Sequence, residues 1–250
     1  MDDYMVDARW DGIIPFEAFI DRDRRIYGTT VAEPVILSDY IETGKKQIKA
    51  WMDNYTLNPW ENQPNYVEVW IEKVAQQGNF EKLVDKYSMG LAPCKGHPSL
   101  TYLNDSVPRF NSAIQRGQKP IILYFGDFDP RGLHIPVKLC QDIEKRMQMR
   151  GMSGEVELKR IALNEDQVID MNLITVPPKA SDSMSPKWLK ERGNIGVAEL
   201  DAIEPKTLSQ MVTDEIAKYF DPELHKELLE REEIEREQYR KALKTFVSTL

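Results

Sequence analysis

Hydrophobic and polar positions between residues 66 and 162 follow two alternating patterns. Residues 66–73 alternate at every second position, which is typical of a strand. Residues 121–125 are apolar without a break and end at turn-forming residues, which is typical of a strand buried on both faces. Two further strands are predicted at residues 88–92 and 156–162. Helical patterns lie between the strands, at residues 75–87, at residues 99–115 with Ser99 as N-cap, and in a stretch that ends near residue 149. This order predicts an α/β fold with a parallel sheet, right-handed crossovers and helices on its flanks.

The regions on either side of this pattern are different. A short helix is predicted at residues 4–10, and a mostly polar helix with Ser38 as its N-cap ends near residue 54. Residues 164–198 are rich in loop-forming residues, which predicts a mobile or substrate-facing connection. Two more helices are predicted, the second of them highly charged, at residues 205–219 and 222–250. The chain is therefore predicted to have three parts: an N-terminal segment (residues 1–65), an α/β domain (66–165) and a loop with a C-terminal helical extension (166–250).

Two acidic residues follow the apolar strand at residues 121–125. Asp127 and Asp129 are two positions apart, so in an extended chain both carboxylates point the same way. They lie at the carboxyl end of a predicted parallel strand, where α/β sheets bind ligands. Two close carboxylates repel each other unless a cation or a proton neutralises one of them, and Mg²⁺ is the natural oxygen-liking partner. The alternative is local turn chemistry, with Asp129 as a helix N-cap and Pro130 as the first helical residue.

A third acid, Glu72, ends the strand at residues 66–73. The ends of parallel strands joined by right-handed crossovers lie on the same rim, so Glu72 is predicted to meet Asp127 and Asp129 around one or two metal ions. Lys73 follows Glu72 and Arg131 follows the acidic pair. A phosphodiester substrate needs such an arrangement, because carboxylates bind the metal that neutralises phosphate charge and the cations bind the nucleic-acid backbone. Glu68 is a competing candidate for the third acid, but it lies in the middle of the strand.

Composition limits the remaining possibilities. The 250 residues carry a formal net charge of −8, which argues against a wholly basic nucleic-acid-binding protein but is compatible with a local basic groove. The cysteines, Cys94 and Cys140, and the three histidines are too scattered for a zinc site. No apolar run is long enough to span a membrane and no signal peptide is visible, so a cytoplasmic protein with free thiols is expected. Neither a Gly-x-Gly-x-x-Gly helix start nor a Gly-Lys-Ser/Thr motif appears, so nucleotide folds with those signatures are not supported.

Three motifs in this order resemble the Toprim domain: Glu72-Lys73, the loop at residues 94–98 and the Gly-Asp-Phe-Asp-Pro-Arg-Gly loop at residues 126–132. The similarity covers about residues 66–165, and it is closest to the A subunit of topoisomerase VI and the related meiotic double-strand-break proteins. The resemblance implies a Toprim-like sheet and DNA as substrate. It also implies a homodimer, a B-type ATPase subunit as a further partner, and a nucleoid-associated location in the cytoplasm.

The resemblance also implies roles for individual residues. The ligands of Mg²⁺, or of Mn²⁺ as an alternative ion, would be Glu72, Asp127 and Asp129. The same three residues would be catalytic, and Glu72 would act as the general acid/base for strand rejoining. Lys73, Lys95 and Arg131 are expected to contact the DNA backbone. The 94–98 loop has His97 between Gly96 and Pro98, at a position where the family often has Tyr.

The chain departs from this family at its start. The family's nucleophile is a tyrosine in a winged helix upstream of the Toprim domain, and the stretch through Arg25 resembles only the tail of that module. Tyr4 lacks the expected neighbours, so the sequence identifies no nucleophilic tyrosine. Three hypotheses stay open: a topoisomerase- or nuclease-like enzyme, a non-catalytic DNA-binding or assembly protein that keeps the metal site, and an Asp-x-Asp phosphotransfer enzyme.

Overall fold

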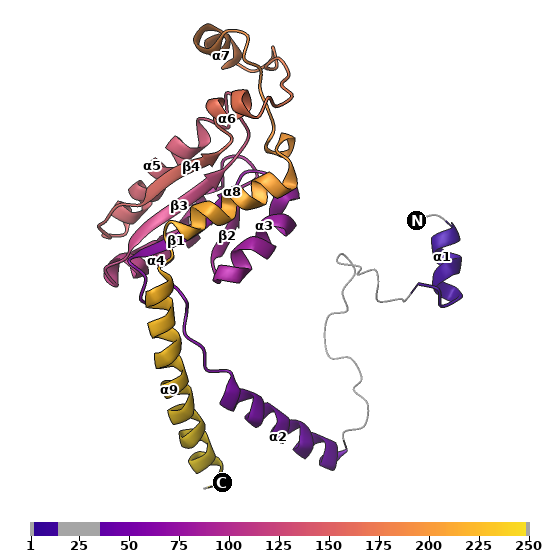
Figure 1. Cartoon of the computed structure of the whole chain (residues 1–250), viewed down its shortest axis with the longest axis vertical. Helices are drawn as coiled ribbons and strands as arrows, with labels where there is room; N and C mark the ends of the chain where they lie inside the picture. Colours follow the sequence, from indigo (N-terminus) through magenta and orange to yellow (C-terminus); the bar gives the residue numbers. More distant parts are fainter. Residues whose placement is uncertain (1–2, 15–35, 249–250) are drawn as a thin grey trace. The chain divides into compact units, whose positions relative to one another are not determined.

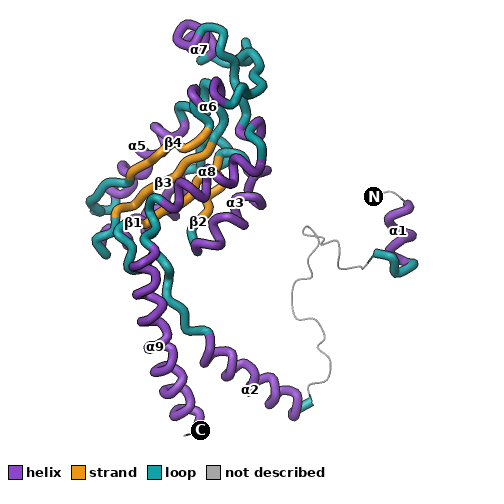
Figure 2. Tube along the Cα trace, in the orientation of Figure 1, coloured by secondary structure: helices purple, strands orange, loops and turns teal. Residues whose placement is uncertain are grey.

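The computed structural model describes residues 3–14 and 36–248, which belong to two compact units, Met1–Asn54 and Tyr55–Leu250. A four-stranded sheet forms the centre of the second unit (Figures 1 and 2). Its strands are β1 (Asn65–Ile71), β2 (Gly90–Pro93), β3 (Lys119–Phe125) and β4 (Glu157–Ala162), in the order β2-β1-β3-β4, and every neighbouring pair is parallel. The predicted α/β fold with a parallel sheet is confirmed.

Helices cover both faces of this sheet (Figure 1). One face packs against α3 (Gln77–Val84) and α8 (Pro205–Ala217), in a core that includes Phe80 and Val212. The other packs against α4 (Leu100–Gln115) and α5 (Ile135–Met149), in a separate core. Side chains of residues 121–125 in β3 alternate between the two cores, and each is apolar or aromatic because both faces of the strand are buried. This explains the unbroken apolar run in the sequence.

The sequence missed two helices between β4 and α8. These are α6 (Glu165–Asp170) and α7 (Ser185–Arg192), in a region predicted to be loop. Asn164 and Gln167 form a capping box at the start of α6, and Trp188 of α7 is buried. Both helices are short, and α7 stands among Pro and Ser residues, so their hydrophobic period is too brief to read from the sequence.

The charged C-terminal helix α9 (Pro222–Ser248) is present as predicted. Residues 55–63 lie along it: the Leu57 amide donates to Glu232 at 2.7 Å, and Arg236 donates to the Tyr55 carbonyl at 3.1 Å. Residues 55–63 thus belong to the same compact unit as the sheet. Residues 166–248 belong to the same unit as the sheet.

The first unit contains α1 (Asp3–Trp10) and α2 (Leu37–Asp53). The prediction of Ser38 as N-cap was wrong, because α2 begins at Leu37 and the capping position falls two residues earlier, on Ile36, which forms no side-chain capping bond. At α4, in contrast, Ser99 is the N-cap as predicted, and its hydroxyl accepts from the Tyr102 amide.

Both cysteines are free thiols, and no helix within the described residues is long and apolar enough to cross a bilayer.

Glu68, the competing third acid, has a different role. Its side chain is 1% exposed and accepts from the Arg109 guanidinium at 2.7 and 3.0 Å. Tyr66 and Trp70 donate to the same carboxylate at 2.7 and 2.9 Å. Both of its oxygens are therefore committed to bonds within the fold.

Removing Arg109 should destabilise the fold. In Arg109→Ala a buried carboxylate loses its charged partner, and the free energy of unfolding in urea should fall by about 3 kcal/mol. The double variant Arg109→Met with Glu68→Gln should lose less, because no unpaired charge stays buried. A loss below about 1 kcal/mol for Arg109→Ala would show that this pair contributes little.

Candidate functional site

Glu72, Asp127 and Asp129, here called the carboxylate cluster, lie at the carboxyl edge of the sheet. The last residues of the central strands, Ile71 and Phe125, are partners in the ladder, and the Glu72 amide donates to the Phe125 carbonyl at 2.9 Å. The Asp127 amide in turn donates to Glu72 Oε2 at 3.2 Å. Adjacent parallel strands thus bring Glu72 beside the acidic pair, as predicted.

Backbone amides orient all three carboxylates. Besides the Asp127 amide on Glu72, the Leu200 amide donates to Asp127 Oδ1 at 2.7 Å and the Gly132 amide to Asp129 Oδ1 at 2.5 Å. The Tyr124 hydroxyl also donates to Glu72 Oε2, at 3.3 Å. Within the described part of the chain, the other oxygens, Glu72 Oε1, Asp127 Oδ2 and Asp129 Oδ2, have no hydrogen-bond or ion-pair partner. One oxygen of each carboxylate is therefore fixed by a backbone amide, and the other oxygen has no protein partner among the described residues.

Burial dominates the electrostatics of the cluster, although Lys73 and Arg160 contribute positive charge nearby. Burial raises the pKa of Glu72, and the charges of Asp127 and Asp129 raise it further. Burial also raises the pKa of Asp127, although the Leu200 amide and Lys73 oppose that change. Ionised carboxylates in this position cost free energy that a bound cation would recover.

The local-turn alternative is correct only in part. Asp129 does accept from the amide three residues later, which is turn chemistry. However, α5 begins at Ile135 with His134 in the N-cap position, so neither Asp129 nor Pro130 starts that helix. Asp129 therefore has no helix to cap.

Two glycines make room for the cluster. A Cβ on Gly126 would lie 2.5 Å from Glu72 Oε2 and 2.7 Å from a ring carbon of Tyr124. A Cβ on Gly132 would collide with the Asp127 carbonyl. The glycines at both ends of the 126–132 loop are thus required for the close approach of backbone and carboxylates.

The predicted DNA-contacting cations are partly engaged by acids. Lys73 forms ion pairs with Glu199, at 2.7 Å, and with Asp201, and these pairs raise its pKa. Arg131 donates to Asp182 at 2.8 Å, but its side chain is 70% exposed. Within the described residues Lys95 has no ion pair. A phosphate that binds Lys73 or Arg131 would exchange with these carboxylates.

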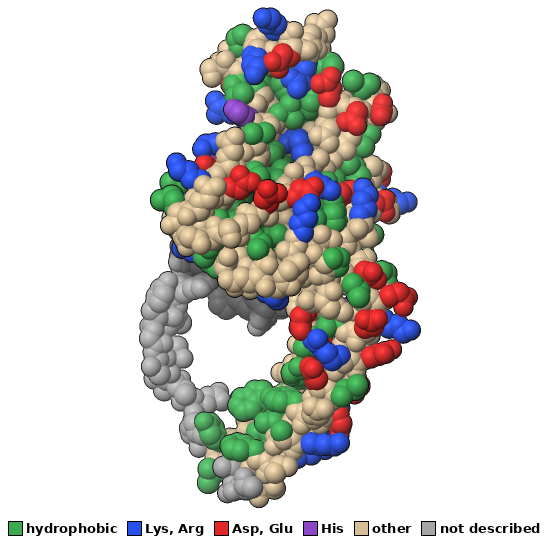
Figure 3. Space-filling view, turned by 90° about the vertical axis from the view of Figure 1, so that its left-hand side faces the viewer, with side chains coloured by type: hydrophobic (Ala, Val, Ile, Leu, Met, Phe, Trp, Pro, Cys, Tyr) green, Lys and Arg blue, Asp and Glu red, His purple; other side chains and the backbone are tan. Residues whose placement is uncertain are grey.

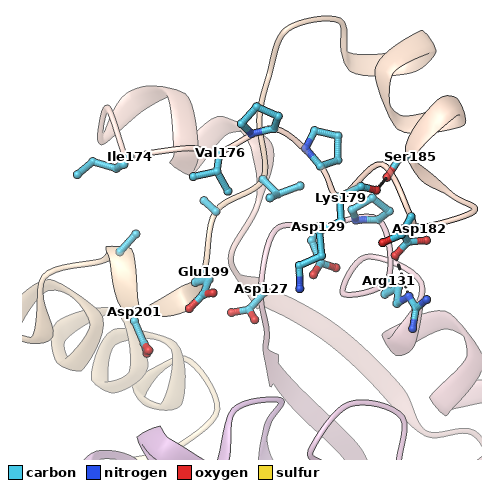
Figure 4. Close-up of a pocket in the computed structure, with 17 residues that line it drawn as sticks. Asp127, Asp129, Arg131, Ile174, Val176, Lys179, Asp182, Ser185, Glu199 and Asp201 are labelled. Carbon is cyan, nitrogen blue, oxygen red and sulfur yellow. Dashed lines mark hydrogen bonds and ion pairs between the residues drawn. The ribbon is translucent and has the colours of Figure 1, made fainter.

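Hollows lie on both sides of Asp127. The larger, about 640 Å³, is shown in Figure 4, with Asp127, Asp129 and Glu199 on one side and Val176 and Lys179 on the segment across from them. The smaller, about 360 Å³, is lined by residues that include Glu72, Lys73, Lys95 and Asp127. The cluster is therefore open to a ligand from two directions, with predicted cations beside each. On the face of the molecule in Figure 3, acidic and basic side chains are interspersed.

Several residues around the cluster were not found from the sequence. Tyr124, Arg160, Asp182, Glu199 and Asp201 all contact the cluster, its loop or its cations. Glu199 and Asp201 offered one signal, because two acids two positions apart repeat the spacing of Asp127 and Asp129. Arg160 offered no such signal, because it is one of three charged residues in the strand pattern at 156–162.

The donor set fits a hard cation. Among the described residues, no group of three or more His, Cys, Asp and Glu side chains is arranged so that it could hold a metal ion as placed. The chemistry of the donors nevertheless matches Mg²⁺ or Mn²⁺, because the atoms without a protein partner are carboxylate oxygens and the pKa values of Glu72 and Asp127 are raised. Metal binding by these residues stays a prediction.

Comparisons with models of known protein families, with curated proteins and with solved structures find no match for this chain. The Toprim resemblance rests on the three sequence motifs alone.

The raised pKa of Glu72 predicts a pH-dependent stability. Without divalent metal at neutral pH, Glu72→Gln should increase the free energy of unfolding, because ionised Glu72 is penalised in the folded state. The gain should shrink as pH falls through the folded-state pKa of Glu72 and vanish below the unfolded value near 4.5, where the wild type is protonated too.

Urea unfolding from pH 4 to 8 would measure this effect, with Glu155→Gln as a control at an exposed acid. A Glu72→Gln variant that is less stable than the wild type at pH 7, or a gain that grows toward low pH, would contradict the electrostatic account.

Proposed function

We propose that this chain is a divalent-metal-dependent protein that acts on DNA phosphodiesters, of the type of the topoisomerase VI A subunit. One observation carries the proposal: three carboxylates at the carboxyl edge of a parallel sheet are each oriented by a backbone amide and each keep an oxygen without a partner among the described residues. When bound there, Mg²⁺ or Mn²⁺ would neutralise phosphate charge and polarise the phosphorus–oxygen bonds.

The residues of the chain would have separate tasks in this function. Glu72, Asp127 and Asp129 would bind the metal, and backbone amides keep their free oxygens turned toward it. Glu72, whose pKa is raised by burial and by the neighbouring carboxylates, would be the general acid/base. Lys73, Lys95 and Arg131 would bind the DNA backbone on the two sides of the cluster.

A second candidate function is DNA binding without cleavage. Tyr124 lies beside the cluster, but its hydroxyl donates to Glu72 and burial raises its pKa, so it is unsuited as a nucleophile. This observation favours a non-catalytic protein, or one in which a different group attacks the phosphate. From the resemblance we also propose a homodimer, a B-type ATPase partner and association with the nucleoid.

Asp127→Asn should abolish function without unfolding the chain. The amide oxygen of Asn can still accept from Leu200, while the loss of one charge should weaken Mg²⁺ and Mn²⁺ binding by about tenfold or more. Calorimetry measures the binding, and nicking of supercoiled plasmid with Mg²⁺, Mn²⁺ or EDTA measures the activity.

Metal-dependent nicking that Asp127→Asn loses and Glu155→Gln keeps would support the enzyme. Metal binding without nicking would support the non-catalytic protein. Normal metal binding by Asp127→Asn would show that the site is assigned to the wrong residues.

The three cations should determine the salt dependence of DNA binding. Changing Lys73, Lys95 and Arg131 together to Gln should weaken duplex binding and flatten the plot of log affinity against log salt by about 0.9 per lost contact. A matched triple variant removes the same charge from exposed lysines elsewhere on the second unit, namely Lys86, Lys145 and Lys226. Equal slopes for the two triple variants would refute the assignment.

A further inference from the structure

Arg160 of β4 makes an unusual set of contacts below the carboxylate cluster. Its guanidinium donates five hydrogen bonds, all of them to backbone carbonyls. The acceptors are Gly126 at 3.1 Å, Asp127 at 2.6 Å, Gly132 at 2.9 Å and Leu163 at 2.9 and 3.2 Å. An arginine that is largely removed from water usually pairs with a carboxylate, and this one does not.

Three of these carbonyls belong to the two ends of the 126–132 loop, and the fourth, that of Leu163, follows β4. Gly126 and Asp127 begin the loop and Gly132 ends it, so one rigid guanidinium fork ties its start to its end. Asp129 lies between the tied ends, and the Gly132 amide that orients the Asp129 carboxylate belongs to the same stretch of backbone. The conformation of the loop therefore depends on Arg160.

The sheet itself directs Arg160 to this place. Arg160 pairs with Tyr124 in the ladder, whereas the next pair is Phe125 with Ala162, so β4 has one extra residue at this point. Such a bulge bends a strand and re-aims its side chains. The guanidinium also lies 5.7 Å from the centre of the Tyr124 ring, whose hydroxyl donates to Glu72. Arg160 thereby contacts residues that support Glu72 and Asp129, namely Tyr124 and Gly132, and the backbone of Asp127 itself.

We propose that Arg160 is a positioning residue of the candidate metal site, which holds the 126–132 loop and Tyr124 so that Glu72, Asp127 and Asp129 present their free oxygens together. The inference rests on the proposed function, since it assumes that the cluster binds a divalent cation. It assigns to Arg160 no contact with the metal or with DNA.

Arg160→Lys tests the proposal, because it keeps the positive charge but cannot reproduce the five-bond fork. The probes are Mn²⁺, for affinity, and Tb³⁺, whose luminescence lifetimes in H₂O and D₂O give the number of water molecules on the bound ion. The variant should bind Mn²⁺ about 10- to 100-fold more weakly and leave more water on Tb³⁺, as expected when supports of metal ligands are lost.

Arg109→Lys is the matched control, an arginine that anchors the buried Glu68 on the α4 side of the sheet. It should reduce stability in urea while both metal readouts stay at wild-type values. If Arg160→Lys behaves in the same way, with wild-type affinity and water number in its folded fraction, Arg160 is merely structural and the proposal is overturned. If the wild type itself does not bind Mn²⁺, the proposed function fails first.

A measurement on the wild type covers the case in which Arg160→Lys does not fold. The guanidinium protons of Arg160 should give resolved, slowly exchanging NMR signals that shift when Mg²⁺ is added. Rapidly exchanging signals, or signals that Mg²⁺ leaves unchanged, would overturn the proposal.

Discussion

Mutual repulsion within the carboxylate cluster is the constraint on which the rest of the site depends. Glu72, Asp127 and Asp129 are brought together where two central parallel strands end, in a partly buried place that raises the pKa of Glu72 and of Asp127. Such an arrangement is unfavourable on its own, and the fold provides supports that oppose its relaxation. Backbone amides fix the carboxylates, and glycines at positions 126 and 132 leave them the space.

The chain following β4 completes the site. The Leu200 amide orients Asp127, and the neighbouring acids Glu199 and Asp201 bind Lys73. Leu200 belongs to the same core as the central strands, which ties this contribution to the packing of the sheet. The chain after residue 164, predicted from the sequence to be a mobile or substrate-facing connection followed by helices, thus lines the candidate site, and it contributes negative charge close to the cations that would contact a phosphate backbone.

Much of the fold could be predicted from the sequence because local patterns determine it. The apolar run before Asp127, the alternation before Glu72 and the N-cap at Ser99 each signal an element within a few residues, and the strand–helix order then implies parallel pairing. The same logic placed Glu72 next to Asp127. The contacts of Arg160, Glu199 and Asp201 could not be predicted in this way, because their partners are distant in sequence and no period or motif connects them.

The most direct test of the account is a crystal structure of the protein grown with Mn²⁺, located by its anomalous scattering. The account predicts an anomalous peak within about 2.5 Å of at least two of the oxygens Glu72 Oε1, Asp127 Oδ2 and Asp129 Oδ2. A peak only between Glu199 and Asp201, or the absence of any peak near the cluster at saturating Mn²⁺, would contradict it.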